Sequence, residues 1–490
     1  MIGIFNYGEV KDILERREVR QDVSGLVGQI IDGVRWNGDD ALRRYALMFD
    51  GSAPERLEVS QAELDRAVDA LDPELRAILE EAAANIRDYH RHQGRNSFVI
   101  SEKDGIILGQ KVVPLDRVGL YIPGGTASYP STVLMNAIPA KLAGCPEVVM
   151  VSPPSRDGDI APVILAAAKI AGVDRVFRVG GAQAIAALAY GTGSIPRVDK
   201  IVGPGNTYVA EAKRQVFGQV SIDMIAGPSE ILVIADSGSD PVQVSADLLS
   251  QAEHDKNASA VLITDSPALA QAVQAEVERQ LADLPRQEIA RASIERNGKI
   301  IITEDLLQGI EAANALAPEH LELCVENPFD YLDKVRHAGS VFLGRSCPEA
   351  LGDYFAGPNH TLPTSGTARF SSPLSVDDFV KKTQFTYYTP AALARSAEKI
   401  ARFAREEGLE GHARSALSRL EKPWRTKKIV SAKNEKSGVR YKIIQAAQDG
   451  HYELWSADPT GRRRLVARGT EAEVHTQYEK YLSGEKREDQ

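Results

Sequence analysis

Cysteine is scarce in this 490-residue chain, and its scarcity narrows the kind of protein that the chain can be. The three cysteines, Cys145, Cys324 and Cys347, follow none of the spacings that mark cysteine metal motifs. They are also too few for a disulfide scaffold, which excludes a small disulfide-stabilised secreted domain. We therefore expect a protein of a reducing compartment.

Targeting signals are missing from the pattern as well. The N-terminal stretch, residues 1 to 9, has neither the basic region nor the apolar region of a secretory signal. No apolar run reaches the length that a membrane span needs. These features predict a cytoplasmic protein with no membrane partner.

The chain has fewer basic than acidic residues, because it contains 58 Lys and Arg residues and 68 Asp and Glu residues. Its net charge is therefore -10. An acidic balance argues against a nucleic-acid partner. The composition, 43% hydrophobic and 26% charged, is that of an ordinary soluble globular protein. The length allows two or more domains.

The dinucleotide fingerprint G-x-G-x-x-G is also absent. Three short apolar runs instead end in glycine-rich turns, Ile122-Pro-Gly-Gly, Val179-Gly-Gly and Val202-Gly-Pro-Gly-Asn. Ligands of open α/β sheets bind beyond the carboxyl ends of the strands, where helix N-termini favour anions. A nucleotide site and plain tight turns both remain open as interpretations of these glycines.

What the chain does contain, from about residue 112 onward, is a regular alternation of apolar strand patterns with helical patterns. Such an alternation predicts parallel sheets with helices on both faces. The predicted strands form two consecutive series, 118–123, 147–151, 175–179 and 200–202, then 230–235, 259–264, 299–303, 320–325 and 339–344.

The two ends of the chain have other patterns. Residues 1–95 and 375–421 are helical in pattern, the latter including a predicted helix at Val376–Lys382. Residues 422–490 contain 15 Lys and Arg residues and 10 Asp and Glu residues, a local charge of +5. Strand patterns at 439–444, 452–455 and 464–467, an Asp449-Gly450 hairpin signal and a helical pattern at 471–482 predict a small appended module there.

A possible metal site begins at the end of the helical pattern around Val244, Leu248 and Leu249. Gln251 and His254 follow three residues apart, so on a helix they would share one face. An amide oxygen and an imidazole nitrogen presented in this way can hold one metal ion. A solvated helix end with no ligand is the alternative interpretation.

Four other stretches bring reactive groups into unusual contexts. They are Ala226-Gly-Pro-Ser229, Ala317-Pro-Glu-His320, the loop from Asp353 to His360, and Glu407-Gly-Leu-Glu-Gly-His412. Each also has a structural interpretation, as a turn serine, a helix-capping aspartate or a surface histidine. Together they supply the nitrogen and oxygen ligands and the acid–base pair of a metal-assisted enzyme.

Over residues 10 to 421 these motifs resemble the histidinol dehydrogenase family. The resemblance is carried, in order, by Tyr121-Ile-Pro-Gly-Gly, Gly180-Gly-Ala-Gln-Ala-Ile-Ala, Gly203-Pro-Gly-Asn, Asp223-Met-Ile-Ala-Gly-Pro-Ser-Glu, Gln251-Ala-Glu-His, Ala317-Pro-Glu-His-Leu and Gly352-Asp-Tyr. It implies a zinc- and NAD-dependent enzyme that oxidises L-histidinol to L-histidine through L-histidinal, the last steps of histidine biosynthesis. A paralogue that oxidises another small polar alcohol or diol, and a non-catalytic nucleotide-binding protein, are the alternatives.

The resemblance also assigns roles to individual residues, all of which this sequence retains. The implied zinc ligands, one ion per subunit, are Gln251, His254, Asp353 and His412, and the implied proton acceptors are Glu319 and His320. The implied NAD contacts are Tyr121, Gln183 and Asn206. The implied substrate contacts are Ser229, Gln251, His254, His320, Asp353, His360, Glu407 and His412.

The family forms homodimers in which the C-terminal segment crosses to the partner, so Glu407 and His412 are expected to complete the other subunit's site.

The expected fold class is α/β, with two incomplete Rossmann-like parallel-sheet domains, helical dimerisation segments at both ends and a small α+β tail. The expected parts are an arm at 1–20, a metal-carrying domain of 21–117 with 231–374, an NAD-side domain at 118–230, a dimerisation segment at 375–421 and the module at 422–490. That module departs from the family pattern and is expected to be a stabilising or oligomerising appendage, with a protein or nucleic-acid contact as the alternative.

Overall fold

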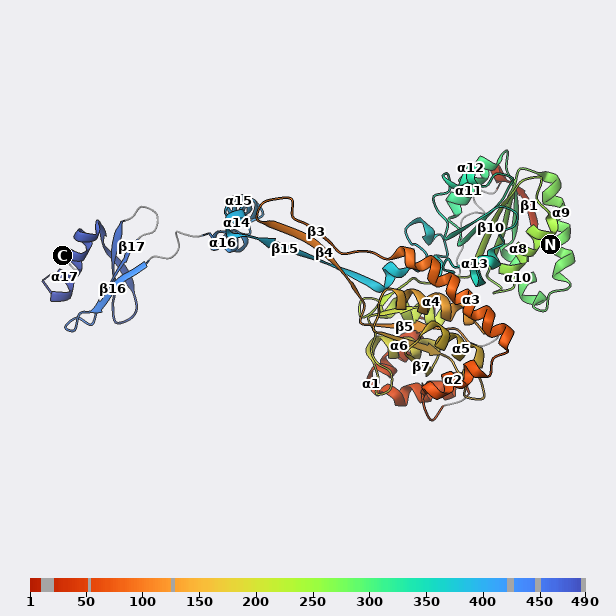
Figure 1. The fold of residues 1–490 in the computed structure, drawn as a ribbon, viewed down its shortest axis with the longest axis horizontal. Coiled ribbons are helices and arrows are strands. Elements are labelled where there is room, and N and C mark those ends of the chain that lie inside the picture. Colours follow the sequence, from red (N-terminus) through yellow and green to blue (C-terminus); the bar gives the residue numbers. More distant parts are fainter. Residues whose placement is uncertain (10–21, 52–53, 125–127, 421–426, 446–450, 486–490) are drawn as a thin grey trace. The chain divides into compact units, whose positions relative to one another are not determined.

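The structure is a computed structural model, and it describes residues 1–9, 22–51, 54–124, 128–420, 427–445 and 451–485 (Figure 1). The chain divides into two units. The first consists of Met1–Asn96 and Val112–Lys382, and the second of Ser97–Lys111 and Thr383–Gln490.

One six-stranded sheet of the first unit has the order β2-β7-β6-β5-β8-β9. All its pairings are parallel except that of β2, which runs antiparallel to β7. Its central strands are continuous apolar runs that are buried on both faces, as parallel sheets require. The strands are β2 (Glu58–Val59), β5 (Arg117–Tyr121), β6 (Glu147–Ser152), β7 (Arg175–Arg178), β8 (Lys200–Val202) and β9 (Ser221–Ile222).

Helices follow the strands of this sheet as predicted, namely α4 (Pro130–Leu142), α5 (Pro162–Ala171), α6 (Gly181–Tyr190) and α7 (Thr207–Val216). Three earlier helices, α1 (Ser24–Phe49), α2 (Gln61–Asp69) and α3 (Pro73–His90), add a further layer. Val27 of α1 shares a core with Ile185, and Leu64 of α2 shares one with Val118.

The amphipathic faces of α1, α2 and α3 bury apolar side chains against the helices and strands of residues 118–230. Helix α3 also contacts residues of 231–374, because Asn85 bonds to the Phe355 carbonyl and His90 contacts Asn359. The predicted grouping of residues 21–117 with 231–374 and the other domain boundaries stay a prediction.

The second sheet of the first unit is parallel throughout and has the order β1-β12-β11-β10-β13-β14. Its strands are β1 (Gly3–Asn6), β10 (Glu230–Ala235), β11 (Ser259–Thr264), β12 (Lys299–Ile302), β13 (His320–Cys324) and β14 (Ser340–Leu343). Its helices are α8 (Pro241–Ala252), α9 (Pro267–Leu281), α10 (Gln287–Asn297), α11 (Leu306–Leu316), α12 (Phe329–Leu332) and α13 (Glu349–Tyr354). The predicted α/β class with two parallel sheets is confirmed, whereas the edge strand β1 was not predicted.

The second unit contains a three-stranded sheet of order β15-β4-β3. It is built from β3 (Phe98–Ile100), β4 (Ile106–Pro114) and β15 (Val380–Tyr388), and α14 (Pro390–Ala394), α15 (Ala397–Glu406) and α16 (Glu410–Leu417) follow. The predicted helix at Val376–Lys382 is wrong. A short 3₁₀ turn ends at Phe379, and the chain then becomes a strand because β-branched and aromatic residues fit a pleated sheet.

The C-terminal residues of the second unit form an antiparallel sheet of order β16-β17-β18-β19 with one helix. The elements are β16 (Lys427–Lys433), β17 (Arg440–Gln445), β18 (Tyr452–Ala457), β19 (Arg463–Gly469) and α17 (Glu471–Ser483). Ile443, Leu454 and Tyr478 belong to a core of its own. The predicted strands and helix are present, β16 was not predicted, and the Asp449-Gly450 turn lies outside the described residues.

Among the helices of the described ranges, none combines the length and the apolar character needed to cross a membrane.

Candidate active site

A cavity of about 1510 Å³ in the first unit receives residues from both sheets. The first sheet contributes loops at the carboxyl ends of β8 and β9, the edge where ligands of α/β sheets bind. The second sheet contributes the opposite edge, the amino ends of β10, β11 and β13. Eight predicted site residues line this cavity: Asn206, Ser229, Gln251, His254, Glu319, His320, Asp353 and His360.

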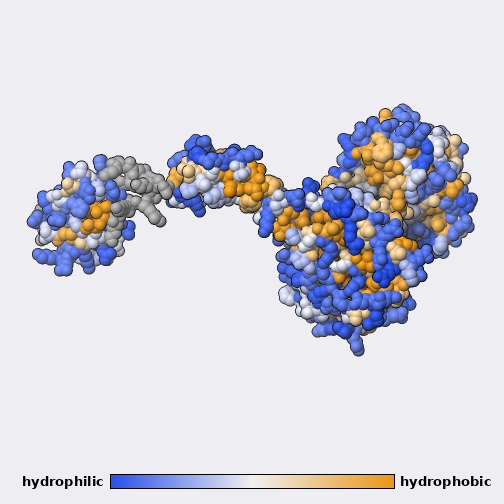
Figure 2. All heavy atoms as spheres, viewed as in Figure 1, coloured by the Kyte–Doolittle hydropathy of each residue, from blue (hydrophilic) through white to orange (hydrophobic). Residues whose placement is uncertain are grey.

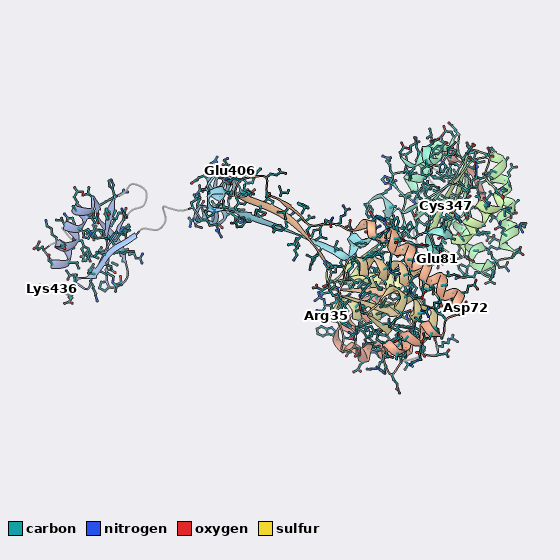
Figure 3. All side chains as sticks on the ribbon, viewed as in Figure 1. Arg35, Asp72, Glu81, Cys347, Glu406 and Lys436 are labelled. Atoms are coloured by element: carbon teal, nitrogen blue, oxygen red, sulfur yellow. The ribbon has the colours of Figure 1, made fainter. Side chains whose placement is uncertain are left out.

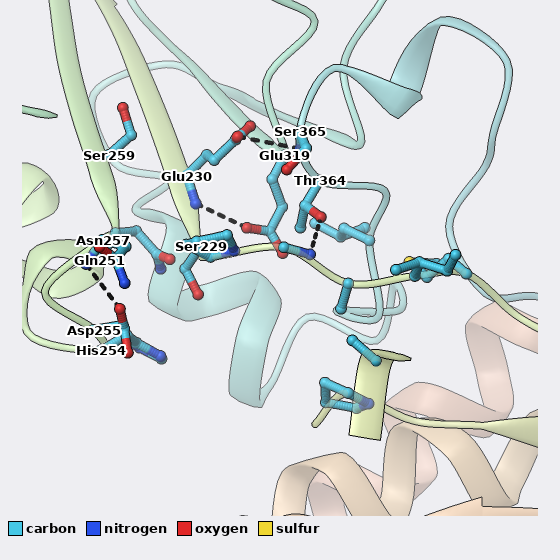
Figure 4. A pocket seen from close by; sticks show the side chains of 18 of the residues that line it. Ser229, Glu230, Gln251, His254, Asp255, Asn257, Ser259, Glu319, Thr364 and Ser365 are labelled. Carbon is cyan, nitrogen blue, oxygen red and sulfur yellow. Dashed lines mark hydrogen bonds between the residues drawn. The ribbon is translucent and has the colours of Figure 1, made fainter. Parts of the chain in front are cut away.

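Gln251 and His254 are placed by the end of α8. Asp240 caps the start of this helix, and Leu248 and Leu249 bury its apolar face. The helix ends at Ala252, so His254 lies in the following turn, where its backbone N–H donates to the Gln251 carbonyl at 3.1 Å. Figure 4 shows both side chains in this region of the pocket. Burial lowers the pKa of His254, against an opposing effect of the Asp353 carboxylate.

Glu319 and His320 are both held by the backbone of Glu230. Figure 4 shows the hydrogen bond between Glu230 and Glu319. The Glu230 N–H donates to Oε2 of Glu319 at 2.9 Å, and Nδ1 of His320 lies 3.0 Å from the Glu230 carbonyl oxygen. Because a carbonyl oxygen only accepts hydrogen bonds, this contact assigns the ring proton to Nδ1.

The other ring nitrogen of His320 faces the carboxylates of α13. Nε2 is buried and has no hydrogen-bond partner within the described part of the chain. It lies 3.7 Å from Oδ1 of Asp353 and 3.9 Å from Oε1 of Glu349. A buried nitrogen in this position is available to a ligand.

The electrostatic environment of the acid–base pair follows from its burial. Burial raises the pKa of Glu319 to about 8, although the adjacent His320 ring opposes this shift. Burial alone would lower the pKa of His320, but the carboxylates of Glu319, Asp353 and Glu349 together raise it to about 10. Each group's charge depends on the other's, so the two titrate as a pair.

Asp353 is presented by α13 beside His360. Nδ1 of His360 lies 3.0 Å from the Asp353 carbonyl oxygen and 3.8 Å from its carboxylate Oδ1. Burial would raise the pKa of Asp353, but the adjacent His320 and His360 rings keep it well below its usual range. Asp353 is therefore an ionised carboxylate, the form in which a metal ligand binds.

The three predicted NAD contacts lie in different surroundings. Asn206 is exposed and caps α7, because its Oδ1 accepts from the N–H groups of Tyr208 and Val209. Tyr121 and Gln183 are almost completely buried, and the Tyr121 hydroxyl accepts from the Gly181 N–H at 3.1 Å. The structure brings Asn206 to the cavity, whereas Tyr121 and Gln183 are buried and are not among the residues that line it.

Glu407 and His412 belong to the second unit. Glu407 follows Glu406, the last residue of α15, which is labelled in Figure 3, and His412 is on α16. Both side chains are exposed. The first unit thus holds three of the four predicted metal ligands, and the second unit holds the fourth.

The sequence patterns did not identify Glu230 or Glu349 as site residues. Glu349 carries a detectable signal, because it precedes Asp353 by four residues and therefore shares a helix face with it. Glu230 acts mainly through its backbone, which no residue pattern reveals.

Two parallel sheets that share a cavity, an acid–base pair and a set of nitrogen and oxygen donors define an α/β enzyme with a site suited to a metal ion. The family model described as histidinol dehydrogenase matches residues 14–420. The chain belongs to the histidinol dehydrogenase family. The predictions of an oxidoreductase and of histidine biosynthesis are thereby confirmed.

Individual relatives agree with this assignment. The histidinol dehydrogenase of Geobacillus kaustophilus is 58% identical over 393 residues, which cover 80% of this chain and 93% of the relative. That of Bacillus subtilis is 54% identical over 393 residues, 80% of this chain and 92% of the relative. The crystal structure of histidinol dehydrogenase from Elizabethkingia anophelis matches with a TM-score of 0.81 at 38% identity, over 85% of this chain and 98% of that one.

Proposed function

We propose that this chain oxidises L-histidinol to L-histidine through L-histidinal, with two NAD+ consumed and one zinc ion bound per subunit. The observation that carries the proposal is the joint attachment of Glu319 and His320 to the Glu230 backbone, in a cavity that Gln251, His254 and Asp353 also line. This arrangement supports the proposal, because the two groups proposed to transfer protons line the same cavity as the proposed metal ligands.

The donor set fits zinc. Gln251 offers an amide oxygen, His254 an imidazole nitrogen and Asp353 an ionised carboxylate, and zinc binds nitrogen and oxygen donors of these kinds. A fourth donor, His412, would come from a second copy of the chain. Bound zinc would supply orientation, by holding the imidazole and amine of the substrate.

His320 is suited to take the hydroxyl proton of the alcohol. Its Nδ1–H is fixed on the Glu230 carbonyl, so Nε2 is the atom that would receive the proton once the ring is neutral. The raised pKa makes His320 a strong base, which must first lose its own Nε2 proton. The carboxylates around the ring stabilise the imidazolium that results. NAD+ would accept the hydride in each of the two oxidations.

Glu319 is suited to the second step, in which a water molecule must add to the aldehyde. Burial raises its pKa to about 8, so its carboxylate is a stronger base than an exposed glutamate. A base with a pKa close to the working pH is the most effective in proton transfer. The resulting hydrate then gives up the second hydride.

The loop from Gly203 to Asn206 supports an NAD site at the first sheet. Gly203 has a φ of +112°, and a Cβ atom there would lie 2.1 Å from the Tyr121 carbonyl oxygen. Only glycine therefore fits where this loop packs against the end of β5. The loop leads into the N-terminus of α7, and a helix N-terminus favours an anionic group such as a pyrophosphate. Tyr121 and Gln183 would act from beneath this surface.

An exposed apolar surface in the second unit supports a homodimer with a shared site. Phe98 of β3 is 49% exposed, Val99 is 63% exposed and Phe385 of β15 is 41% exposed. Figure 2 shows hydrophobic side chains open on the surface of this unit. A contiguous surface of this kind is typical of a protein interface. In the proposed dimer, Glu407 and His412 of one copy would complete the site of the other.

The deciding experiment is NADH formation by the purified chain with L-histidinol. The expected result is two NADH per histidinol, with zinc near one per subunit by metal analysis. Absence of activity after zinc has been restored would overturn the proposal. Activity with another small polar alcohol but none with histidinol would favour the paralogue.

A further inference from the structure

The loop that follows α13 carries His360, a proposed substrate contact, to the wall of the cavity. Three residues of this loop, Phe355, Gly357 and Asn359, contact the last two turns of α3. In the described part of the chain no residue of α3 lines the cavity, and the proposed mechanism gives this helix no role. The contacts nevertheless join α3 to a loop of the site.

The first part of the loop lies against Asn85 of α3. Nδ2 of Asn85 donates to the Phe355 carbonyl oxygen at 2.9 Å. Gly357 has a φ of +106°, and a Cβ atom there would lie 2.6 Å from the Asn85 carbonyl oxygen. Only glycine therefore lets the loop approach the helix this closely.

The last part of the loop is fixed by the buried side chain of Asn359. Its Nδ2 donates to the Met135 carbonyl oxygen of α4 at 2.6 Å and lies 3.3 Å from Nε2 of His90. Its Oδ1 accepts from the Thr361 N–H at 2.8 Å. This last contact closes a turn around His360, so the backbone is held on both sides of that residue.

The ring of His90 is the second acceptor that the Asn359 amide requires. Nδ1 of this completely buried histidine lies 2.9 Å from the Ile86 carbonyl oxygen. A carbonyl oxygen only accepts, so Nδ1 carries the proton and Nε2 accepts from Asn359. Burial lowers the pKa of His90, which favours the neutral ring. A buried polar network whose members are paired in this way holds a single geometry.

The ring of His360 is held from the opposite end of the loop. Its Nδ1 lies 3.0 Å from the Asp353 carbonyl oxygen, so Nδ1 carries the proton and Nε2 is left as an acceptor. An acceptor nitrogen suits the ammonium or the imidazole N–H of the proposed substrate. Because His360 directly follows Asn359, the place of this nitrogen depends on where α3 holds the loop.

We propose that His90 and Asn359 are positioning residues, which fix the place of His360 and thereby set the affinity for the substrate. Neither of them lines the cavity, so both act through His360. The inference rests on the proposed function, because it takes His360 as a contact to L-histidinol.

His90→Leu tests the proposal, because it keeps the site filled but removes the acceptor for the Asn359 amide. We expect KM for L-histidinol to rise by about 5–30-fold, the effect of one unmade buried hydrogen bond. The kcat should change much less, because a contact that is equally strong in the ground and transition states affects KM alone. KM for NAD+ should stay at the parent value. Steady-state NADH formation measures all three.

Three further variants complete the experiment. His90→Gln again offers an acceptor to Asn359 and should recover most of the affinity. His92→Leu, at an exposed histidine two residues further on, is the matched control and should leave KM unchanged. Asn85→Ala removes the contact to the Phe355 carbonyl and should raise KM by a smaller factor. This variant keeps the test decisive if His90→Leu does not fold.

A contact that only stabilises the fold would lower the melting temperature and the amount of active enzyme, but it would leave KM unchanged. Unchanged KM for L-histidinol in His90→Leu would therefore overturn the positioning role, as would an equal rise in KM for NAD+. A KM in His90→Gln as high as that of His90→Leu would also overturn it. If His90→Leu does not fold, unchanged KM in Asn85→Ala overturns it.

Failure of the proposed function is distinguishable from failure of this inference. A parent chain that does not oxidise L-histidinol overturns both. An active parent whose KM is unaffected by the substitutions overturns the positioning role alone.

Discussion

Lys213 and Asp223 form an ion pair that is closed off from solvent, with side chains 2% and 1% exposed. The Lys213 ammonium also donates to the Gly203 carbonyl at 2.9 Å, and Oδ2 of Asp223 accepts from the Gly203 N–H at 2.8 Å. Asp223 further accepts from the Met224 N–H. The pair thus ties the loop after β8 to the loop after β9, and both loops line the cavity.

Lys213→Met should therefore destabilise the protein and weaken NAD binding together. Removing one partner leaves a buried charge uncompensated, which costs about 3–5 kcal/mol of unfolding free energy. Thermal or denaturant unfolding measures the stability, and calorimetric titration measures the NAD affinity. The double variant Lys213→Met with Asp223→Asn should recover part of the stability, and a fully additive loss would contradict a coupled pair.

Glu319→Gln should separate the two oxidations. The first oxidation needs no activated water, so its rate should remain largely intact. The second should slow by about 10²–10⁴-fold, the usual contribution of a general base. Stopped-flow NADH formation with L-histidinal supplied directly measures the second step alone. Equal losses in the two half-reactions would contradict the division of roles between Glu319 and His320.

His254→Ala and His412→Ala should each remove zinc and activity, and mixing them should restore part of both. If each site takes ligands from two chains, a mixed dimer has one site with both defects and one intact site. Random reassociation of equal amounts then gives roughly a quarter of the parent activity. Subunit exchange is checked by native mass spectrometry with one variant isotopically labelled. Exchange without recovery would show that the site is not shared between subunits.

Asp50 gives a pH-dependent stability prediction that does not involve the proton-transfer pair. It follows the last residue of α1, and its Oδ2 is buried without a partner among the described residues. Burial raises its pKa to about 6. The Asp50 carboxyl therefore binds a proton more tightly in the folded protein than in the unfolded chain. The stability that the protonated carboxyl contributes is lost as pH rises from about 4 to 6.

Asp50→Asn should then raise the melting temperature at pH 7 and have little effect at pH 4. Partial exposure of the group limits the gain to about 1–2 kcal/mol. Glu63 is a control whose pKa is shifted in the opposite direction, because hydrogen bonds from Ser60 and the Arg178 guanidinium lower it to about 2. Glu63→Gln should destabilise the protein above pH 5. An Asp50→Asn effect that does not change with pH would contradict the assignment.

Truncation after residue 420 should leave the steady-state rate with L-histidinol unchanged. The family match ends at this residue, and the following β16–β19 sheet has a hydrophobic core of its own. The melting temperature and the oligomeric state by light scattering show whether the module stabilises or associates. Salt-dependent binding of nucleic acid that is lost on truncation would contradict its interpretation as an appendage.

Patterns within short stretches predicted most of the strands and helices of the first unit. Buried parallel strands such as Glu230–Ala235 and Ser259–Thr264 are continuous apolar runs, which stand out from their polar flanks. The strand Val380–Tyr388 was missed because its side chains are mostly exposed, so no apolar run marks it. Strand β1, at the edge of its sheet, is too short to have a recognisable period.

The candidate site, like the fold, could be predicted from the sequence only in part. Gln251, His254, Glu319, His320 and Asp353 are detectable in the sequence because their motifs are ordered and dense in reactive groups. The convergence of β10, α8, β13 and α13 on one cavity depends on contacts between residues about 90 to 130 positions apart, such as Glu230 with Glu319.

The sequence by itself determined the α/β class, which follows from local periodicity. It also determined the family and the identity of the reactive side chains, which follow from the resemblance of its ordered motifs. Only the tertiary structure decided that α1, α2 and α3 pack on the first sheet, that Tyr121 is buried, and that the Glu230 backbone holds the acid–base pair beside Glu349. Those features arise from long-range packing and from backbone hydrogen bonds. Neither has a signature in the order of the residues.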